Sequence, residues 1–142
     1  WLPKQRILFS GDACVNGPYN YMGDGNSIDW LKTLDAVKAL KPKIICPGHG
    51  ARADGTLVDD QKAYFTALHS AVKPLVKKKQ SLEQVRAQVP AIRTKLEKNA
   101  QIKRYIGKRF GEQIEKVYGD HTGKVLGRLD VRKQAEEEEK KK

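Results

Sequence analysis

The chain has 142 residues, enough for one domain with a hydrophobic core, and it carries a formal net charge of +11. No apolar run approaches the roughly 20 residues that a membrane span requires, and no signal-peptide or other targeting pattern is present. We therefore expect a soluble chain without a membrane partner, and nothing in the sequence indicates a cellular compartment. Two cysteines are too few for the disulfide framework of a small secreted domain.

The positive charge is concentrated in the middle of the chain. Residues 61–125 hold fifteen Lys or Arg against five Asp or Glu, whereas residues 1–60 hold seven of each. A segment of this kind is usually the solvated face of a set of helices. A surface this basic also attracts anionic substrates or nucleic acid over a long range, and added salt weakens that attraction.

The first part of the chain predicts a strand, a helix and a second strand. Residues 5–10 contain the apolar run Ile7-Leu8-Phe9, as expected of a strand buried on both faces, and residues 43–46 contain a second apolar run, Ile44-Ile45-Cys46. Residues 27–40 carry an apolar stripe at helical spacing. A helical crossover makes the two strands parallel, which places Asp12 and His49 at the same edge of the sheet. A carboxylate and an imidazole in that position indicate one half of a metal site.

The segment from residue 12 to residue 26 is rich in Gly and Asn and predicts a long loop. Loops of this length are usually kept for function. Tyr19, Tyr21 and Met22 lie within it. They either cover a ligand site beside Asp12 or pin the loop to the body of the protein.

Capping residues predict where three helices begin. Ser27 is a suitable N-cap for the first helix. Thr56 with Asp59 resembles a capping box for the second helix, and Ser81 with Gln84 resembles another for the third.

The second half of the chain is predicted to be helical. We expect Pro74 to kink or end its helix, and Pro90 to divide the next helix in two. A last helix is predicted over residues 99–118. The fold class is therefore α/β, with a strand-helix-strand layer followed by a helical C-terminal segment. These patterns divide the chain into an α/β segment, a basic helical segment packed on it and a charged tail expected to be disordered: residues 1–72, 73–125 and 126–142.

Three short motifs carry a resemblance to a known family: Phe9-Ser10-Gly11-Asp12, the Ser27, Trp30, Leu31 and Leu34 positions of the first helix, and Pro47-Gly48-His49-Gly50. The chain resembles the C-terminal half of the metallo-β-lactamase fold, in its branch of glyoxalase-II-like hydrolases. The resemblance covers about residues 4–70 and extends more loosely to about residue 118. It implies that Asp12 bridges two metal ions, zinc or else iron or manganese, and that His49 holds the second ion. It also implies that the other ligands, a His-x-His-x-Asp-His run and a further His, belong to an N-terminal half that this chain lacks.

Cys14 and His121 are further candidate ligands. Cys14 is predicted to lie in the loop after Asp12, where a thiolate could reach a metal, although two buried or half-buried thiols explain both cysteines more simply. A disulfide between Cys14 and Cys46 is the remaining alternative. His121 lies in a sequence that resembles a ligand-bearing turn of the family, but that turn precedes the bridging Asp in the family and follows it here. His69 lies on an apolar helix face, which favours a structural role.

Asp12 and His49 are thus the predicted catalytic and metal-binding residues, and two ligands alone cannot hold zinc tightly. We interpret the chain as part of a metal-dependent hydrolase of the ester, thioester, lactone or lactam class, inactive or weakly active alone. The missing N-terminal half, or a second copy of the chain in a homo-oligomer that rebuilds the sandwich, would complete a two-metal site. The basic segment would then favour an anionic small-molecule substrate.

The alternative is a non-catalytic basic protein that binds nucleic acid or another polyanion. Its affinity would fall steeply with added salt if several phosphates were bound. The sequence contains no nucleic-acid recognition motif and leaves both interpretations open. The predicted anion-binding residues are Lys77, Lys78, Lys79, Arg93, Lys103, Arg104, Lys108 and Arg109, with Lys95 and Lys98 beside them.

Overall fold

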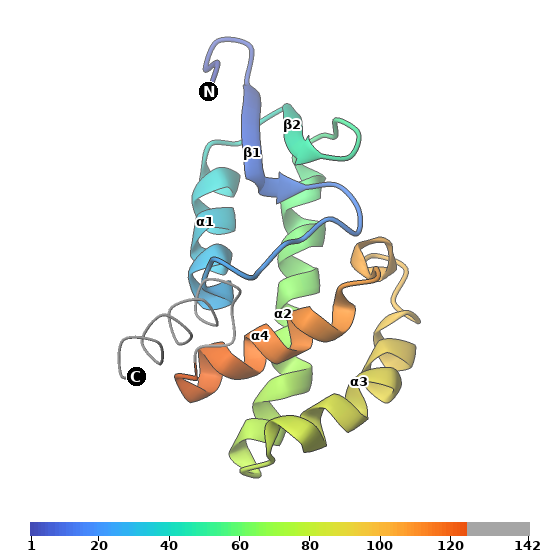
Figure 1. Ribbon diagram of the computed structural model, residues 1–142. Coiled ribbons are helices and arrows are strands. Elements are labelled where there is room, and N and C mark those ends of the chain that lie inside the picture. Colours follow the sequence, from blue (N-terminus) through green and yellow to red (C-terminus); the bar gives the residue numbers. More distant parts are fainter. Residues whose placement is uncertain (125–142) are drawn as a thin grey trace, which may run out of the picture.

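The computed structural model describes residues 1–124, and the predicted tail at residues 126–142 lies outside the described residues. Figure 1 shows how the elements follow one another in space. They are β1 (Ile7–Val15), α1 (Ser27–Ala39), β2 (Ile44–His49), α2 (Thr56–Lys77), α3 (Leu82–Leu96), a short 3-10 helix (Lys103–Tyr105) and α4 (Phe110–Thr122). The predicted mixed α/β class is confirmed, with a strand pair in the first half and helices in the second.

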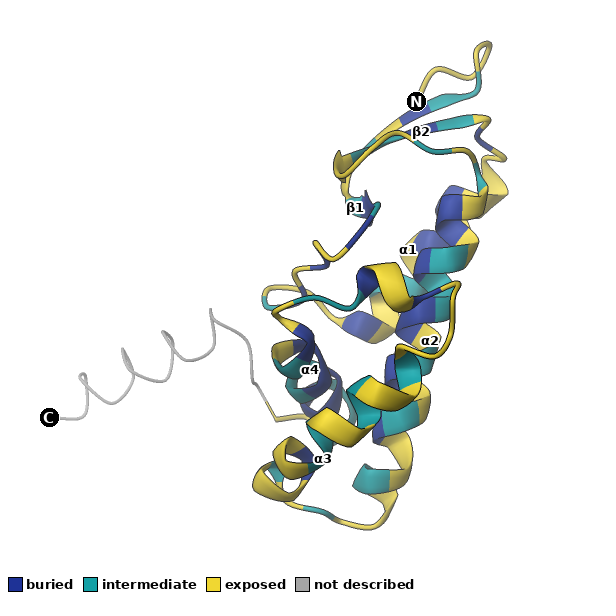
Figure 2. Ribbon diagram, turned by 90° about the vertical axis from the view of Figure 1, so that its right-hand side faces the viewer, coloured by how far each residue is buried: buried dark blue, intermediate teal, exposed yellow. Residues whose placement is uncertain are grey.

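β1 and β2 form a parallel two-stranded sheet, as the strand-helix-strand pattern predicts. α1 connects the two strands, and α1 and α2 pack against each other and against β1, so they cover one face of it. Leu8 points into this layer and is 8% exposed, whereas the next residue, Phe9, is 65% exposed. The expectation of a strand buried on both faces is therefore wrong for the described residues, because helices cover only one face of β1. Figure 2 shows that both strands carry exposed positions beside buried ones.

The helix starts agree only in part with the predictions. The capping box at the start of α3 is confirmed. α1 is capped by the side chain of Asn26, which accepts hydrogen bonds from two backbone N–H groups of the first turn, so Ser27 is not the N-cap. The carboxylate of Asp54 accepts hydrogen bonds from the backbone N–H and the hydroxyl of Thr56, so the predicted pairing of Thr56 with Asp59 is wrong.

Neither proline ends its helix, so the predicted division of the helix at Pro90 is wrong, and of the two outcomes predicted for Pro74 the ending of the helix is excluded. Pro74 lies in the last turn of α2, where only a few backbone hydrogen bonds remain to be lost. Pro90 lies inside α3, and the packing of α3 on α2 and α4 holds the helix together across the missing N–H. The helix predicted over residues 99–118 begins only at Phe110, because residues 103–105 form a 3-10 turn.

One hydrophobic core extends from β1 to α4 and contains residues of both the α/β segment and the basic helical segment. Tyr64 of α2 stacks on Tyr105, with 5.4 Å between the ring centroids, and Phe65 packs on Trp30 of α1 at 4.9 Å. α4 packs on α2 beneath the loop that follows β1. Among the described residues, no helix is both long and apolar enough to cross a membrane.

Candidate functional site

Asp12 and His49 lie together near the carboxyl ends of the two strands. The Asp12 Oδ1 atom is 3.4 Å from the His49 Nε2 atom, and the two side chains are 75% and 58% exposed. The parallel register brings them together, because Gly11 lies opposite Pro47 and Val15 lies opposite His49. The register shifts on both sides of Gly11, whose φ of +52° bends the strand immediately before Asp12. The carboxylate and the imidazole are thus neighbours on an open surface.

Two glycines allow the second strand to approach the first this closely. A Cβ atom on Gly48 would lie 2.1 Å from Asp12 Oδ1, 2.7 Å from the carbonyl carbon of Gly11 and 2.8 Å from the Asp12 nitrogen. A Cβ atom on Gly50, whose φ is +89°, would lie 2.0 Å from the carbonyl oxygen of Asn16. The positions on either side of His49 therefore have no room for any side chain, and this clearance fixes where the imidazole lies.

Asn16 holds the turn that carries His49, a role that the sequence patterns do not reveal. Its backbone N–H donates to the His49 carbonyl at 2.9 Å, and its side-chain amide donates to the Ala51 carbonyl at 2.9 Å. The ring of Tyr19 lies against the imidazole, with 5.7 Å between the centroids and 32° between the planes. His49 is therefore positioned by backbone hydrogen bonds and an aromatic neighbour.

A buried chain of side-chain amides pins the loop between β1 and α1 to the helices. Gln61 of α2 accepts from the Val15 N–H at 3.1 Å and donates to the Asn20 side-chain oxygen at 3.0 Å. Gln113 of α4 donates to the Asn20 carbonyl at 2.6 Å and accepts from the Tyr64 hydroxyl. The sequence patterns do not reveal these residues, because a Gln in a helix gives no signal that it is buried.

A groove of about 530 Å³ opens beside His49. Tyr19 and Tyr21 are 51% and 38% exposed, whereas the neighbouring Met22 is 3% exposed. The prediction that these residues pin the loop to the body of the protein is therefore confirmed for Met22. The two tyrosines instead line the groove next to the candidate site. The lining residues come from this loop, from the end of β2 and from the segment before α4: Pro18, Tyr19, Tyr21, His49, Gly107, Lys108 and Arg109.

Cys14 lies inside β1, so the prediction that it lies in a loop is wrong. The strand continues past Asp12 to Val15, and the Cys14 side chain is fully buried in the core. Burial raises the pKa of the Cys14 thiol, which disfavours the thiolate that a metal would need. Cys46 is half-buried, and both cysteines are free, which confirms the prediction of two buried or half-buried thiols.

His121 lies in α4 and contacts His69 of α2, with 2.8 Å between His121 Nε2 and His69 Nδ1. Burial lowers the pKa of both imidazoles and nearby Lys73 lowers it further, while Asp120 acts in the opposite direction. When both imidazoles are neutral, one ring donates the hydrogen bond and the other accepts it, as expected of a structural His at position 69.

Within residues 1–124 no three His, Cys, Asp or Glu side chains gather as a metal site. Of the predicted ligands, the structure brings together Asp12 and His49.

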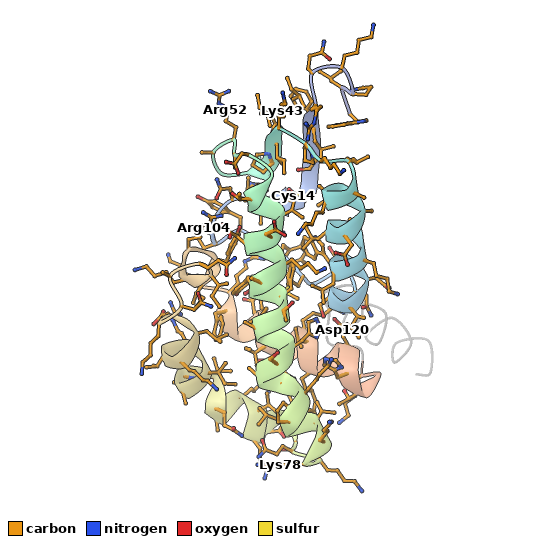
Figure 3. The ribbon with its side chains drawn as sticks, turned by 180° about the vertical axis from the view of Figure 1, so that it is seen from behind. Cys14, Lys43, Arg52, Lys78, Arg104 and Asp120 are labelled. Carbon is orange, nitrogen blue, oxygen red and sulfur yellow. The ribbon has the colours of Figure 1, made fainter. Side chains whose placement is uncertain are left out.

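The predicted anion-binding residues are spread over the molecule. Lys77, Lys78 and Lys79 lie at the C-terminal end of α2, and Figure 3 shows Lys78 at the far end of that helix from Arg104. The side chains of Arg93 and Arg104 pair with those of acidic residues at 2.8 and 2.7 Å. Lys103 lies in the 3-10 helix. The two members of the set that share a groove with His49 are Lys108 and Arg109.

Compared with known proteins, the sequence matches no protein-family model and no curated protein.

Proposed function

We propose that this chain supplies one half of the active site of a metal-dependent hydrolase of the metallo-β-lactamase type, acting on esters, thioesters, lactones or lactams. The observation that carries the proposal is the pair of exposed side chains of Asp12 and His49, 3.4 Å apart near the ends of parallel strands. Two ligand atoms that are each about 2.1 Å from a zinc ion, at a tetrahedral angle, are about 3.4 Å apart. The separation of the two atoms therefore matches that of two ligands of a single ion.

In this proposal Asp12 bridges two metal ions and His49 holds the second one. Bound ions of this kind provide a hydroxide nucleophile near neutral pH and polarise the scissile group. The chain itself provides rigidity, because Gly48, Gly50 and Asn16 fix the imidazole against the strand that carries Asp12. The remaining ligands would come from an N-terminal half or from a second copy of the chain.

The alternative, a polyanion-binding protein without catalysis, has less support in the arrangement of the basic side chains. A nucleic acid requires a continuous row of phosphate contacts. Here the C-terminal end of α2, which carries the lysines, lies apart from the strand ends and the loop after β1 that line the groove (Figure 1), and Arg93 and Arg104 are partly neutralised by acidic partners. The Asp12–His49 pair has no role in that alternative.

A zinc titration followed by NMR of the imidazole nitrogens tests the proposal on the isolated chain. A complete structural zinc site provides about 10–16 kcal/mol, so two ligands should provide roughly 5–8 kcal/mol, which corresponds to a Kd of roughly 1–200 µM. We expect the His49 signals to shift in this range and the Asp12→Asn variant to abolish the response. His121→Gln is the matched control, and it should leave the His49 response unchanged. A first response at His69 or His121, or no effect of Asp12→Asn, would contradict the proposal.

Elemental analysis across a sizing peak with light scattering then shows what completes the site. About two metal ions per dimer, lost in Asp12→Asn, would show that a second copy supplies the other ligands. A monomer that holds zinc only weakly would instead indicate a separate N-terminal half.

A further inference from the structure

We infer that the groove beside His49 binds a small organic anion that carries a flat ring, with the ring between the two tyrosines and the anionic group at Lys108 and Arg109. The inference rests on the proposed function, because it assigns the substrate class of the same site. It is carried by the aromatic and cationic side chains that the fold brings to one groove from distant parts of the sequence.

The aromatic part of the groove is already organised. Tyr19 is held against the imidazole of His49 at 5.7 Å between centroids, and it remains half exposed. Tyr21 is also exposed, and the guanidinium of Arg109 lies 5.3 Å from the centre of its ring. Large exposed aromatic side chains next to a candidate catalytic residue are typical of a binding surface. Flat rings gain stacking energy on such side chains at little cost in conformational entropy.

The cationic part of the groove lies at the start of α4. Lys108 and Arg109 are adjacent, and within residues 1–124 no ion pair with an acidic side chain involves either of them. Gly107 packs so closely on Pro18 that a Cβ atom there would be 2.6 Å from the Pro18 Cβ atom. This contact holds the two cations next to the loop that carries the tyrosines. An anion bound here would accept charge-assisted hydrogen bonds from both of these side chains.

The size of the groove favours a small molecule over a nucleic acid. About 530 Å³ lies within the range of small-molecule sites. Lys77, Lys78 and Lys79 lie at the C-terminal end of α2. Arg93 donates a hydrogen bond to the Gly107 carbonyl beside the groove at 3.4 Å, but its guanidinium, like that of Arg104, also pairs with an acidic side chain. A long strand that stacked on the tyrosines would therefore find few further cations beyond Lys108 and Arg109. His49 forms one wall, so the opposite end of a bound molecule would reach the Asp12–His49 pair. The anion would thus be recognised at one end of the substrate and the reacting group presented at the other.

Binding of 2-naphthoate to the ¹⁵N-labelled chain in metal-free buffer tests the inference, with the uncharged 2-naphthamide as the matched ligand. We expect naphthoate to bind about tenfold more tightly than naphthamide and to shift the signals of Tyr19, His49 and Gly107. The double variant Lys108→Gln with Arg109→Gln should lose about tenfold in naphthoate affinity and leave naphthamide unchanged. Tyr19→Leu should weaken both ligands several-fold, because stacking contributes to both. The double variant Lys4→Gln with Lys43→Gln, at exposed positions before the two strands, removes the same amount of charge and is the matched control; it should change neither affinity by more than about twofold.

Equal affinities for the acid and the amide would overturn the inference, and so would shifts confined to other parts of the chain. Loss of affinity in Lys4→Gln with Lys43→Gln equal to that in Lys108→Gln with Arg109→Gln would show that net charge, not the groove, binds the anion. Displacement of naphthoate by a ten-residue oligothymidylate at lower concentration would favour the nucleic-acid alternative. Because no metal is present, the result is separate from the zinc titration. Zinc binding without naphthoate binding overturns only the groove assignment, and the reverse overturns only the hydrolase proposal.

Discussion

Replacing Gly48 with Ala tests whether the close approach of the strands builds the candidate site. The added Cβ atom would lie 2.1 Å from the Asp12 carboxylate oxygen, and this clash alone could be relieved by rotating the side chain. It would also lie 2.7 and 2.8 Å from backbone atoms of Gly11 and Asp12, and those atoms cannot rotate away. Since carbon and nitrogen atoms in contact are about 3.4 Å or more apart, the strands must separate by roughly 0.6 Å at this point.

Gly48 is exposed, but the added methyl group would enter a tightly fitted region between the backbones of the two strands. Inserting one methyl group into such a region costs about 1–3 kcal/mol, and the backbone contacts place Gly48→Ala at the upper end, at about 3 kcal/mol. In a chain of this size that corresponds to a fall in Tm of about 10 °C. The same separation moves the His49 imidazole away from Asp12, so the variant should also lose the stabilisation that zinc gives the native chain.

Thermal melts with and without zinc provide the assay, and Gly25→Ala provides the matched control. Gly25 has open space around its would-be Cβ atom, so that variant should melt within about 2 °C of the native chain. In the double variant Gly48→Ala with Asp12→Ala, only the carboxylate clash is relieved, and most of the loss should remain. A Gly48→Ala variant that melts with the native chain would refute the reasoning. Full recovery in the double variant would show that the backbone contacts do not limit the approach of the strands.

Three further outcomes follow from buried polar groups and caps. Because burial keeps the pKa of His69 and His121 below the unfolded value of about 6.5, the unfolded chain binds more protons below that pH. The free energy of unfolding, measured by urea titration, should therefore fall between pH 7 and pH 5. It should fall less in His121→Gln, and an equal fall in that variant would contradict this. Gln61→Leu should cost about 2–3 kcal/mol in the same assay, since it leaves two buried groups without a partner, and a cost below about 0.5 kcal/mol would exclude that role. Ser81→Ala should cost about 1 kcal/mol through the lost cap, whereas the exposed Ser70→Ala in α2 should cost nothing measurable.

The parts of the fold that depend on local rules could be predicted from the sequence. Apolar runs and helical spacing gave two parallel strands with a helix between them, and the reciprocal bonds of Ser81 and Gln84 were predicted because they span only four residues. Where two residues offered the same local signal, the sequence did not show which of them forms the hydrogen bond. Asp54 and Asp59 both offer a carboxylate near Thr56, and only the backbone conformation before α2 decides that Asp54 accepts its hydrogen bonds.

The candidate site could likewise be predicted from the sequence only in part. The parallel-strand argument predicts that Asp12 and His49 meet, and the structure places their side chains 3.4 Å apart. Their supports could not be predicted, because they are contacts between distant parts of the chain. Asn20 bonds with Gln61, 41 residues away, and with Gln113, 93 residues away. Such partners are known only once α2 and α4 are packed, and the same packing brings the cations at the start of α4 to the tyrosines of the loop.

β1 carries both a proposed metal ligand, Asp12, and an apolar side chain that no helix covers, Phe9. Phe9 is 65% exposed, three residues before Asp12 in the same strand. Burying a Phe side chain contributes about 1.5–3 kcal/mol, so a polypeptide that covered this side would gain stability there. In our proposal the same polypeptide carries the missing ligands, and its docking would cover Phe9 and complete the site at Asp12 together. Linkage then requires that the factor by which docking strengthens metal binding equals the factor by which metal strengthens docking. Under this proposal, an isolated chain with weak zinc binding and an uncovered strand and an assembly with tight zinc binding and a buried strand would be two states of one equilibrium.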